Sequence, residues 1–65
     1  MIKELLAKVS EKQDLTFEES RQAIDEIMSG EVSDAVISSF LTALAMKGET
    51  EEEIAGAATG MRAKA

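Results

Sequence analysis

Apolar residues recur along this chain at the three- and four-residue spacing of amphipathic helices, with polar residues between them. The strict alternation typical of strands does not occur, proline is absent, and β-branched residues are sparse. The pattern predicts an all-α fold, a small four-helix bundle-like domain. At 65 residues there is room for a single domain, residues 1–65.

The first two predicted helices each carry one apolar stripe. One covers residues 2–12 and is broken at 13–15; the other begins after Thr16, where Thr16 and Glu19 have the spacing of a capping box. Gly30 is placed to end the second helix in a left-handed conformation. The two stripes consist of Ile2, Leu5, Leu6 and Val9, and of Phe17, Ile24, Ile27 and Met28.

The third predicted helix, residues 34–47 with Ser33 as its N-cap, has no charged residue between positions 35 and 46, although 31% of the chain is charged. A helix without a charged face is usually covered on more than one side. It is either the central helix of the bundle, wrapped by the other three, or part of a subunit interface. Its core side comprises Val36, Ile37, Phe40, Leu41 and Leu44, and the candidate interface on its other side comprises Ala35, Ser38, Ser39, Thr42, Ala45 and Met46.

The fourth predicted helix follows Gly48 and opens on a second capping box, Thr50 with Glu53. Its spacing predicts an inward stripe of Ile54, Ala57, Ala58, Met61 and Ala65. Gly56 and Gly60 then fall on the far face, as tolerated surface glycines or as a candidate contact with another domain that a Cβ would obstruct. On a free face, Gly56→Ala and Gly60→Ala are expected to stabilise the chain.

Charge and composition exclude several classes of function. With 13 acidic against 7 basic residues the net charge is −6, which disfavours nucleic-acid binding. No apolar run is long enough to span a membrane, and no basic amphipathic face suits a membrane surface. The start of the chain lacks the apolar core of a signal peptide, so we expect a cytoplasmic protein.

The sequence predicts no catalytic activity for this chain alone. Histidine and cysteine are absent, and no nucleophile with a base, metal cluster or phosphate loop is visible. The run Glu51-Glu52-Glu53 fits a helix start better than a metal site. We therefore expect no catalytic, cofactor-binding or metal-binding residue, and a partner surface as the support that so small a core needs.

The order of four motifs resembles the N-terminal helical domain of the anthranilate phosphoribosyltransferase family. The motifs are LTFEES at 15–20, IMSGEVSD at 27–34, FLTALAMKGET at 40–50 and EEIAGAATGMR at 52–62. Ser38 and Ser39 depart from the alanines expected there. Two alternatives stay open: the related helical domain of pyrimidine nucleoside phosphorylases, and a stand-alone acidic helical carrier or adaptor similar to acyl carrier proteins.

The resemblance implies a domain of a larger two-domain transferase whose α/β catalytic domain is missing from these residues. In such an enzyme, anthranilate is joined to phosphoribosyl pyrophosphate with Mg²⁺ in tryptophan biosynthesis, and the residues for that chemistry lie outside this domain. The resemblance further implies a homodimer through the first and third helices and one wall of the cleft between domains. Later segments of such a polypeptide also pack on this domain, so that an isolated copy exposes apolar surface.

Overall fold

The structure is a computed structural model that describes residues 1–64. It contains four α-helices within those residues and no strand: α1 (Ile2–Ser10), α2 (Phe17–Met28), α3 (Asp34–Lys47) and α4 (Glu51–Ala63). The all-α prediction is therefore confirmed, and α3 has the predicted bounds. The first helix is shorter than predicted because Lys12 adopts a left-handed φ of 64°.

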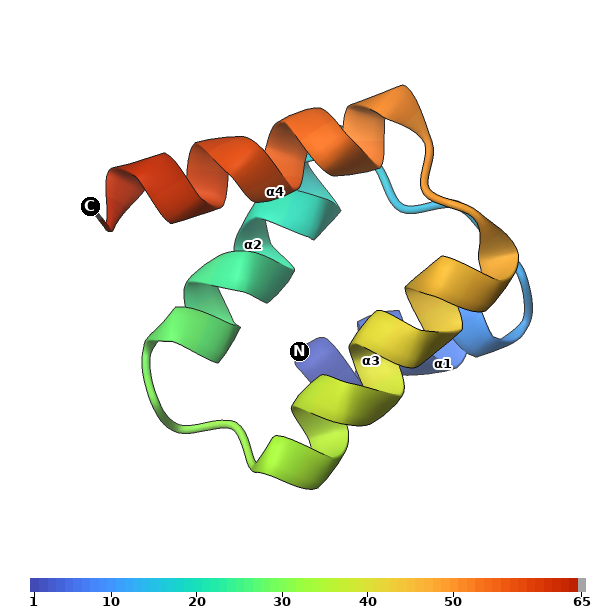
Figure 1. Ribbon diagram of the computed structural model, residues 1–65, viewed down its shortest axis with the longest axis horizontal. Coiled ribbons are helices and arrows are strands. Elements are labelled where there is room, and N and C mark those ends of the chain that lie inside the picture. Colours follow the sequence, from blue (N-terminus) through green and yellow to red (C-terminus); the bar gives the residue numbers. More distant parts are fainter. Residues whose placement is uncertain (65) are drawn as a thin grey trace.

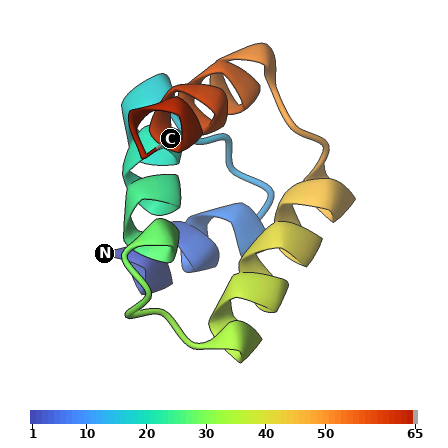
Figure 2. The same cartoon turned by 60° about the vertical axis from the view of Figure 1, so that its left-hand side comes forward.

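The helices pack as two pairs that are not neighbours in sequence. Helix α4 lies along α2, and α1 lies across α3 (Figure 1). A view turned by 60° shows the same pairing, with α3 set apart from α4 (Figure 2). The chain therefore moves from one pair to the other at each of its three connections.

Capping side chains fix the starts of three helices as the sequence predicts. The Thr16 hydroxyl accepts the Glu19 N–H, and the Glu19 carboxylate accepts the Thr16 N–H. Thr50 and Glu53 form the same reciprocal pair at α4, and Ser33 caps α3. Each cap satisfies backbone N–H groups that a helix start would otherwise leave without partners.

The core lies mainly where α1 meets α3 and the connection between α1 and α2. Leu15 is fully enclosed although it belongs to that connection, so the predicted break after α1 is a packed segment rather than a surface loop. The buried apolar side chains are Ile2, Leu5, Val9, Leu15, Ala23, Phe40 and Leu44.

The predicted inward face of α4 is wrong. Gly56 and Gly60, expected on the far side, are buried against α2, whereas Ile54 and Met61 are 57% and 51% exposed. Ala57 and Ala58 are half-buried, and Ala65 of the same predicted stripe lies outside the described residues. The two glycines face α2 because only a residue without a Cβ allows the helices to approach so closely.

The explanation of α3 as a helix wrapped by the other three is also wrong. The molecule measures 30 × 25 × 17 Å, and its thin dimension leaves room for no more than about two helix diameters of roughly 10 Å. Helix α3 buries Phe40 and Leu44 against its neighbours and turns its other side outward. The apolar stripe predicted for the second helix is also only partly buried, since Phe17 and Met28 are exposed.

Candidate interaction surfaces

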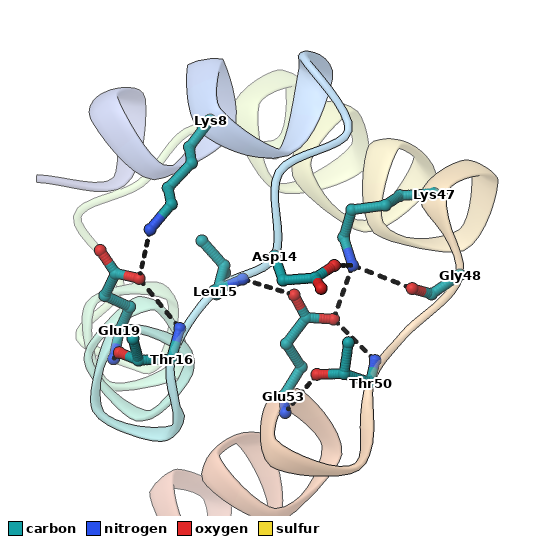
Figure 3. A network of polar contacts seen from close by, with 9 residues as sticks. All are labelled: Lys8, Asp14, Leu15, Thr16, Glu19, Lys47, Gly48, Thr50 and Glu53. Atoms are coloured by element: carbon teal, nitrogen blue, oxygen red, sulfur yellow. Dashed lines mark hydrogen bonds and ion pairs between the residues drawn. The ribbon is translucent and has the colours of Figure 1, made fainter.

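A buried carboxylate joins three segments of the chain at one end of the molecule (Figure 3). The Glu53 side chain accepts the Leu15 N–H at 2.6 Å, the Thr50 N–H at 2.8 Å and Lys47 Nζ at 2.8 Å. Lys47 Nζ also donates to Asp14 Oδ1 and to the Gly48 carbonyl. The α1–α2 connection, the end of α3 and the start of α4 are thereby held together.

Burial disfavours the charged forms of Glu53 and Lys47, whereas their hydrogen bonds favour them, and the hydrogen bonds have the larger effect on both pKa values. Burial by itself would raise the pKa of the Glu53 carboxyl, but the bonds from Lys47, Leu15 and Thr50 hold that pKa below its ordinary value of 4.5. Burial likewise works against the Lys47 ammonium, yet its bonds to Glu53 and Asp14 raise the pKa of Lys47 above 10.5. Both groups are therefore charged at neutral pH, as a buried ion pair that is fully hydrogen-bonded.

The capping box of α2, Thr16 with Glu19, carries the same arrangement in a more exposed form. Lys8 of α1 donates to Glu19 Oε1 at 2.8 Å, on the oxygen that also accepts the Thr16 N–H (Figure 3). The bond from Lys8 lowers the pKa of Glu19. Each capping-box glutamate thus receives a lysine from the helix before it.

The sequence reasoning identified both boxes but not the burial of Glu53. It gave Glu53 a place in the capping box with Thr50 and, together with Glu51 and Glu52, a stabilising role at an exposed helix start. Glu53 differs because its side chain is only 1% exposed, against 66% for Asp14 at the same lysine. The available signal was its position as the third residue of α4, where the side chain of a capping-box glutamate turns back toward the preceding connection.

The uncharged outer side of α3 lies on the surface, as the interface prediction requires. All six of its predicted residues are exposed, Met46 to 82%: Ala35, Ser38, Ser39, Thr42, Ala45 and Met46. We call these six residues the α3 face. The structure brings them together on one helix, and it removes Gly56 and Gly60 from the candidate interface because α2 covers them.

An apolar groove of about 400 Å³ separates α3 from α4, with α2 at its floor. Leu41 on one side and Ile54 and Met61 on the other are each about half exposed. The lining residues are Ser20, Ile24, Ile27, Phe40, Leu41, Leu44, Glu49, Glu53, Ile54, Ala57, Ala58 and Met61. Exposed apolar surface was expected of this domain, but sequence reasoning missed this groove because it assigned Ile54 and Met61 to the domain's own core.

Catalytic or metal-binding groups do not gather on either surface. Within residues 1–64, no three acidic side chains lie where they could hold a metal ion. None of the helices in that part of the chain has the length and apolar character that crossing a bilayer requires. The fold defines a small all-α domain.

Comparison with known proteins places this domain in a family. Residues 3–65 match the glycosyl transferase family, helical bundle domain, and the chain belongs to that family. No solved structure matches it.

The chain is also similar to three curated proteins named anthranilate phosphoribosyltransferase. It is 55% identical over 62 residues to that of Lachnoclostridium phytofermentans, 95% of this chain and 18% of the relative. It is 56% identical over 64 residues to that of Geotalea uraniireducens, 98% of this chain and 18% of the relative. For Lactiplantibacillus plantarum the identity is 52% over 65 residues, 100% of this chain and 19% of the relative. The chain thus spans about a fifth of the length of these relatives.

Proposed function

We propose that this chain is the N-terminal helical domain of an anthranilate phosphoribosyltransferase, acting in dimerisation and in forming the cleft between domains. The observation that carries the proposal is the identity of 52–56% to proteins of that name, extending over 95–100% of the chain. The domain does not catalyse by itself. The joining of anthranilate to phosphoribosyl pyrophosphate, with Mg²⁺, belongs to the missing α/β domain.

The dimerisation role rests on the α3 face. Six adjacent residues without charge are exposed on a chain that is 31% charged, and serine, threonine and alanine side chains permit close helix packing. A two-fold contact uses the same patch on both subunits, and the proposed homodimer uses α3 together with α1. The cytoplasmic localisation expected from the sequence is kept as part of this proposal.

A chimera tests the function. The corresponding domain of the Lachnoclostridium phytofermentans enzyme is replaced by this chain, and formation of phosphoribosylanthranilate is measured together with the molecular mass in solution. We expect an active dimer from the chimera and no activity from the 65-residue chain alone. A folded, dimeric chimera without activity would contradict the assignment.

A matched pair of variants tests the dimer contact. In the chimera, Thr42→Arg places a charge at the middle of the α3 face and is expected to give a monomer. Ala63→Arg, at an exposed position on α4 away from the α3 face, is expected to leave the dimer intact. Equal behaviour of the two variants would remove the α3 face from the interface.

A further inference from the structure

Lys12 holds a backbone conformation that this chain otherwise gives to glycine. Its φ is 64°, in the left-handed region, and it follows the end of α1. The residues in this conformation at the ends of α2 and α3 are Gly30 and Gly48, with φ values of 83° and 91°. A residue with a Cβ is strained there, whereas glycine is not. Backbone strain of this kind concentrates at residues whose side chains have a function.

The side chain of Lys12 has no charged partner within residues 1–64. Lys8 and Lys47 each bind a capping-box glutamate, but Lys12 forms no ion pair in that part of the chain. It is exposed, and together with Met46 it lines a pocket of about 250 Å³ between α1 and α3. Because Met46 belongs to the α3 face, Lys12 lies at the edge of that face.

The net charge of the domain is divided unevenly between its two helix pairs. Helices α2 and α4 contain seven acidic residues and two arginines, a net charge of −5. Helices α1 and α3 contain three lysines and two acidic residues, a net charge of +1. Two copies that approach through α2 and α4 would repel each other strongly, whereas two copies that approach through α1 and α3 would not. Charge therefore favours contact between copies on the side where Lys12 lies.

We propose that Lys12 is a subunit-contact residue, whose ammonium group pairs with a carboxylate of a second copy at the edge of the α3 face. The proposal rests on the dimer proposed above and adds an ion pair to its uncharged contact. The partner carboxylate is that of Glu11, at the end of α1, or of Asp34, at the start of α3. Both are exposed and form no ion pair within residues 1–64. A two-fold axis makes the same contact twice.

Opposite effects on the monomer and on the dimer test the proposal. Lys12→Gly relieves the strained backbone and should raise the urea midpoint of the 65-residue chain. That midpoint is measured with Thr42→Arg in every sample, to suppress association through the α3 face, and circular dichroism confirms folding. In the chimera without Thr42→Arg, Lys12→Gly should weaken dimerisation about fivefold by sedimentation equilibrium. A lysine that acts only within its own domain would leave the dimer affinity unchanged.

Further variants of the chimera separate the charge from the backbone. Lys12→Met keeps a long side chain without the charge and should weaken the dimer as Lys12→Gly does, whereas Lys12→Arg should preserve it. Arg62→Met makes the same change in net charge at an exposed position on α4 and should leave the dimer affinity unchanged. Glu11→Gln or Asp34→Asn should reproduce the loss, and the effective one should add little to Lys12→Met.

The results that would overturn this ion pair differ from those that would overturn the dimer. A chimera that is monomeric before any substitution would contradict the proposed dimerisation, and the ion pair with it. A dimer whose affinity neither Lys12→Gly nor Lys12→Met changes would exclude the ion pair alone. A urea midpoint lowered by Lys12→Gly would show that the lysine serves its own domain, against the proposal.

Discussion

Glu53 serves two structural purposes with one side chain. Its carboxylate completes the capping box of α4 and also binds Lys47. The same carboxylate accepts the Leu15 N–H, 38 residues earlier in the sequence. A buried carboxylate with this many donors is favourable only while all of them are in place. Substitution of any one partner is therefore felt at all three connected segments.

The stability of the domain should fall in acid because of Glu53. Its pKa in the folded state lies below the ordinary 4.5, so the charged form stabilises the fold above that value. This contribution is lost as pH falls through the lower, folded-state pKa. The raised pKa of Lys47 means that its charged form stabilises the fold below 10.5, and this contribution is lost as pH rises through the higher, folded-state pKa. Urea unfolding between pH 3 and pH 7 should show a decreasing free energy of unfolding toward the acid end.

Variants of Glu53 and Lys47 test whether this ion pair causes the loss of stability in acid. Glu53→Gln leaves the buried Lys47 with the exposed Asp14 as its one charged partner and should cost about 3 kcal/mol. The double variant with Lys47→Met removes both charges and should recover part of this loss. The double variant should also have a flatter acid profile than the parent, and an equally steep profile would assign the acid sensitivity to other carboxylates such as Glu19.

Gly56→Ala should destabilise the domain, in reverse of the expectation from sequence. A Cβ at this position would overlap the Phe17 carbonyl oxygen of α2 and lie 3.1 Å from Ser20 Cβ. The helix-propensity gain of about 1 kcal/mol is smaller than the cost of forcing two helices apart, so the net loss should be about 2 kcal/mol.

Thermal melts measure this loss against two comparisons. Gly60→Ala should cost less, because the added Cβ would come no closer than 3.0 Å to the Ile24 side chain and 3.1 Å to the Arg21 carbonyl oxygen. Ala55→Gly, on the exposed side of α4, reports propensity alone and should cost about 1 kcal/mol. A Gly56→Ala variant that melts above the parent would show that α2 and α4 do not pack this closely.

At the scale of the helix, the caps are the part of this fold that sequence predicts best. A capping box depends on residues three positions apart, so Thr16, Ser33 and Thr50 could be identified without knowledge of the tertiary structure. The same holds for Gly30 and Gly48, whose φ values of 83° and 91° follow from their place after a helix.

The orientation of α4 could not be predicted in this way. An apolar stripe indicates that something covers a helix, but not whether the cover comes from the same domain or from a partner. Ile54 and Met61 form the more apolar side of α4, yet α2 packs on the side of Gly56 and Gly60. Glycine does not count as an apolar residue in a helical stripe, although close contact between helices favours it.

The cap of α3 offers a matched test at this scale. Ser33→Ala removes the acceptor of the Val36 N–H and should lower the free energy of unfolding by about 1 kcal/mol. Ser38→Ala makes the same chemical change on the exposed side of the same helix, where alanine is the better helix former, and should be neutral or slightly stabilising. Equal losses at both positions would argue against the cap.

At the scale of the whole molecule, stability should depend on concentration. The dimer contact proposed for the α3 face exists only in the folded state, and association of folded chains shifts the unfolding equilibrium. The melting temperature of the 65-residue chain should therefore rise with chain concentration. The rise should be smaller for Thr42→Arg, and a melting temperature independent of concentration would contradict association through the α3 face.

The pairing of α1 with α3 and of α2 with α4 also determines how this domain can be divided. A cut in the connection between α2 and α3 leaves one fragment with α1 and α2 and the other with α3 and α4. Both extensive helix contacts, α1 with α3 and α2 with α4, are then divided between the two fragments. The Lys47 and Glu53 contacts to Asp14 and Leu15 cross the same cut. Neither half therefore holds a core of its own, and the four helices should fold as a single cooperative unit.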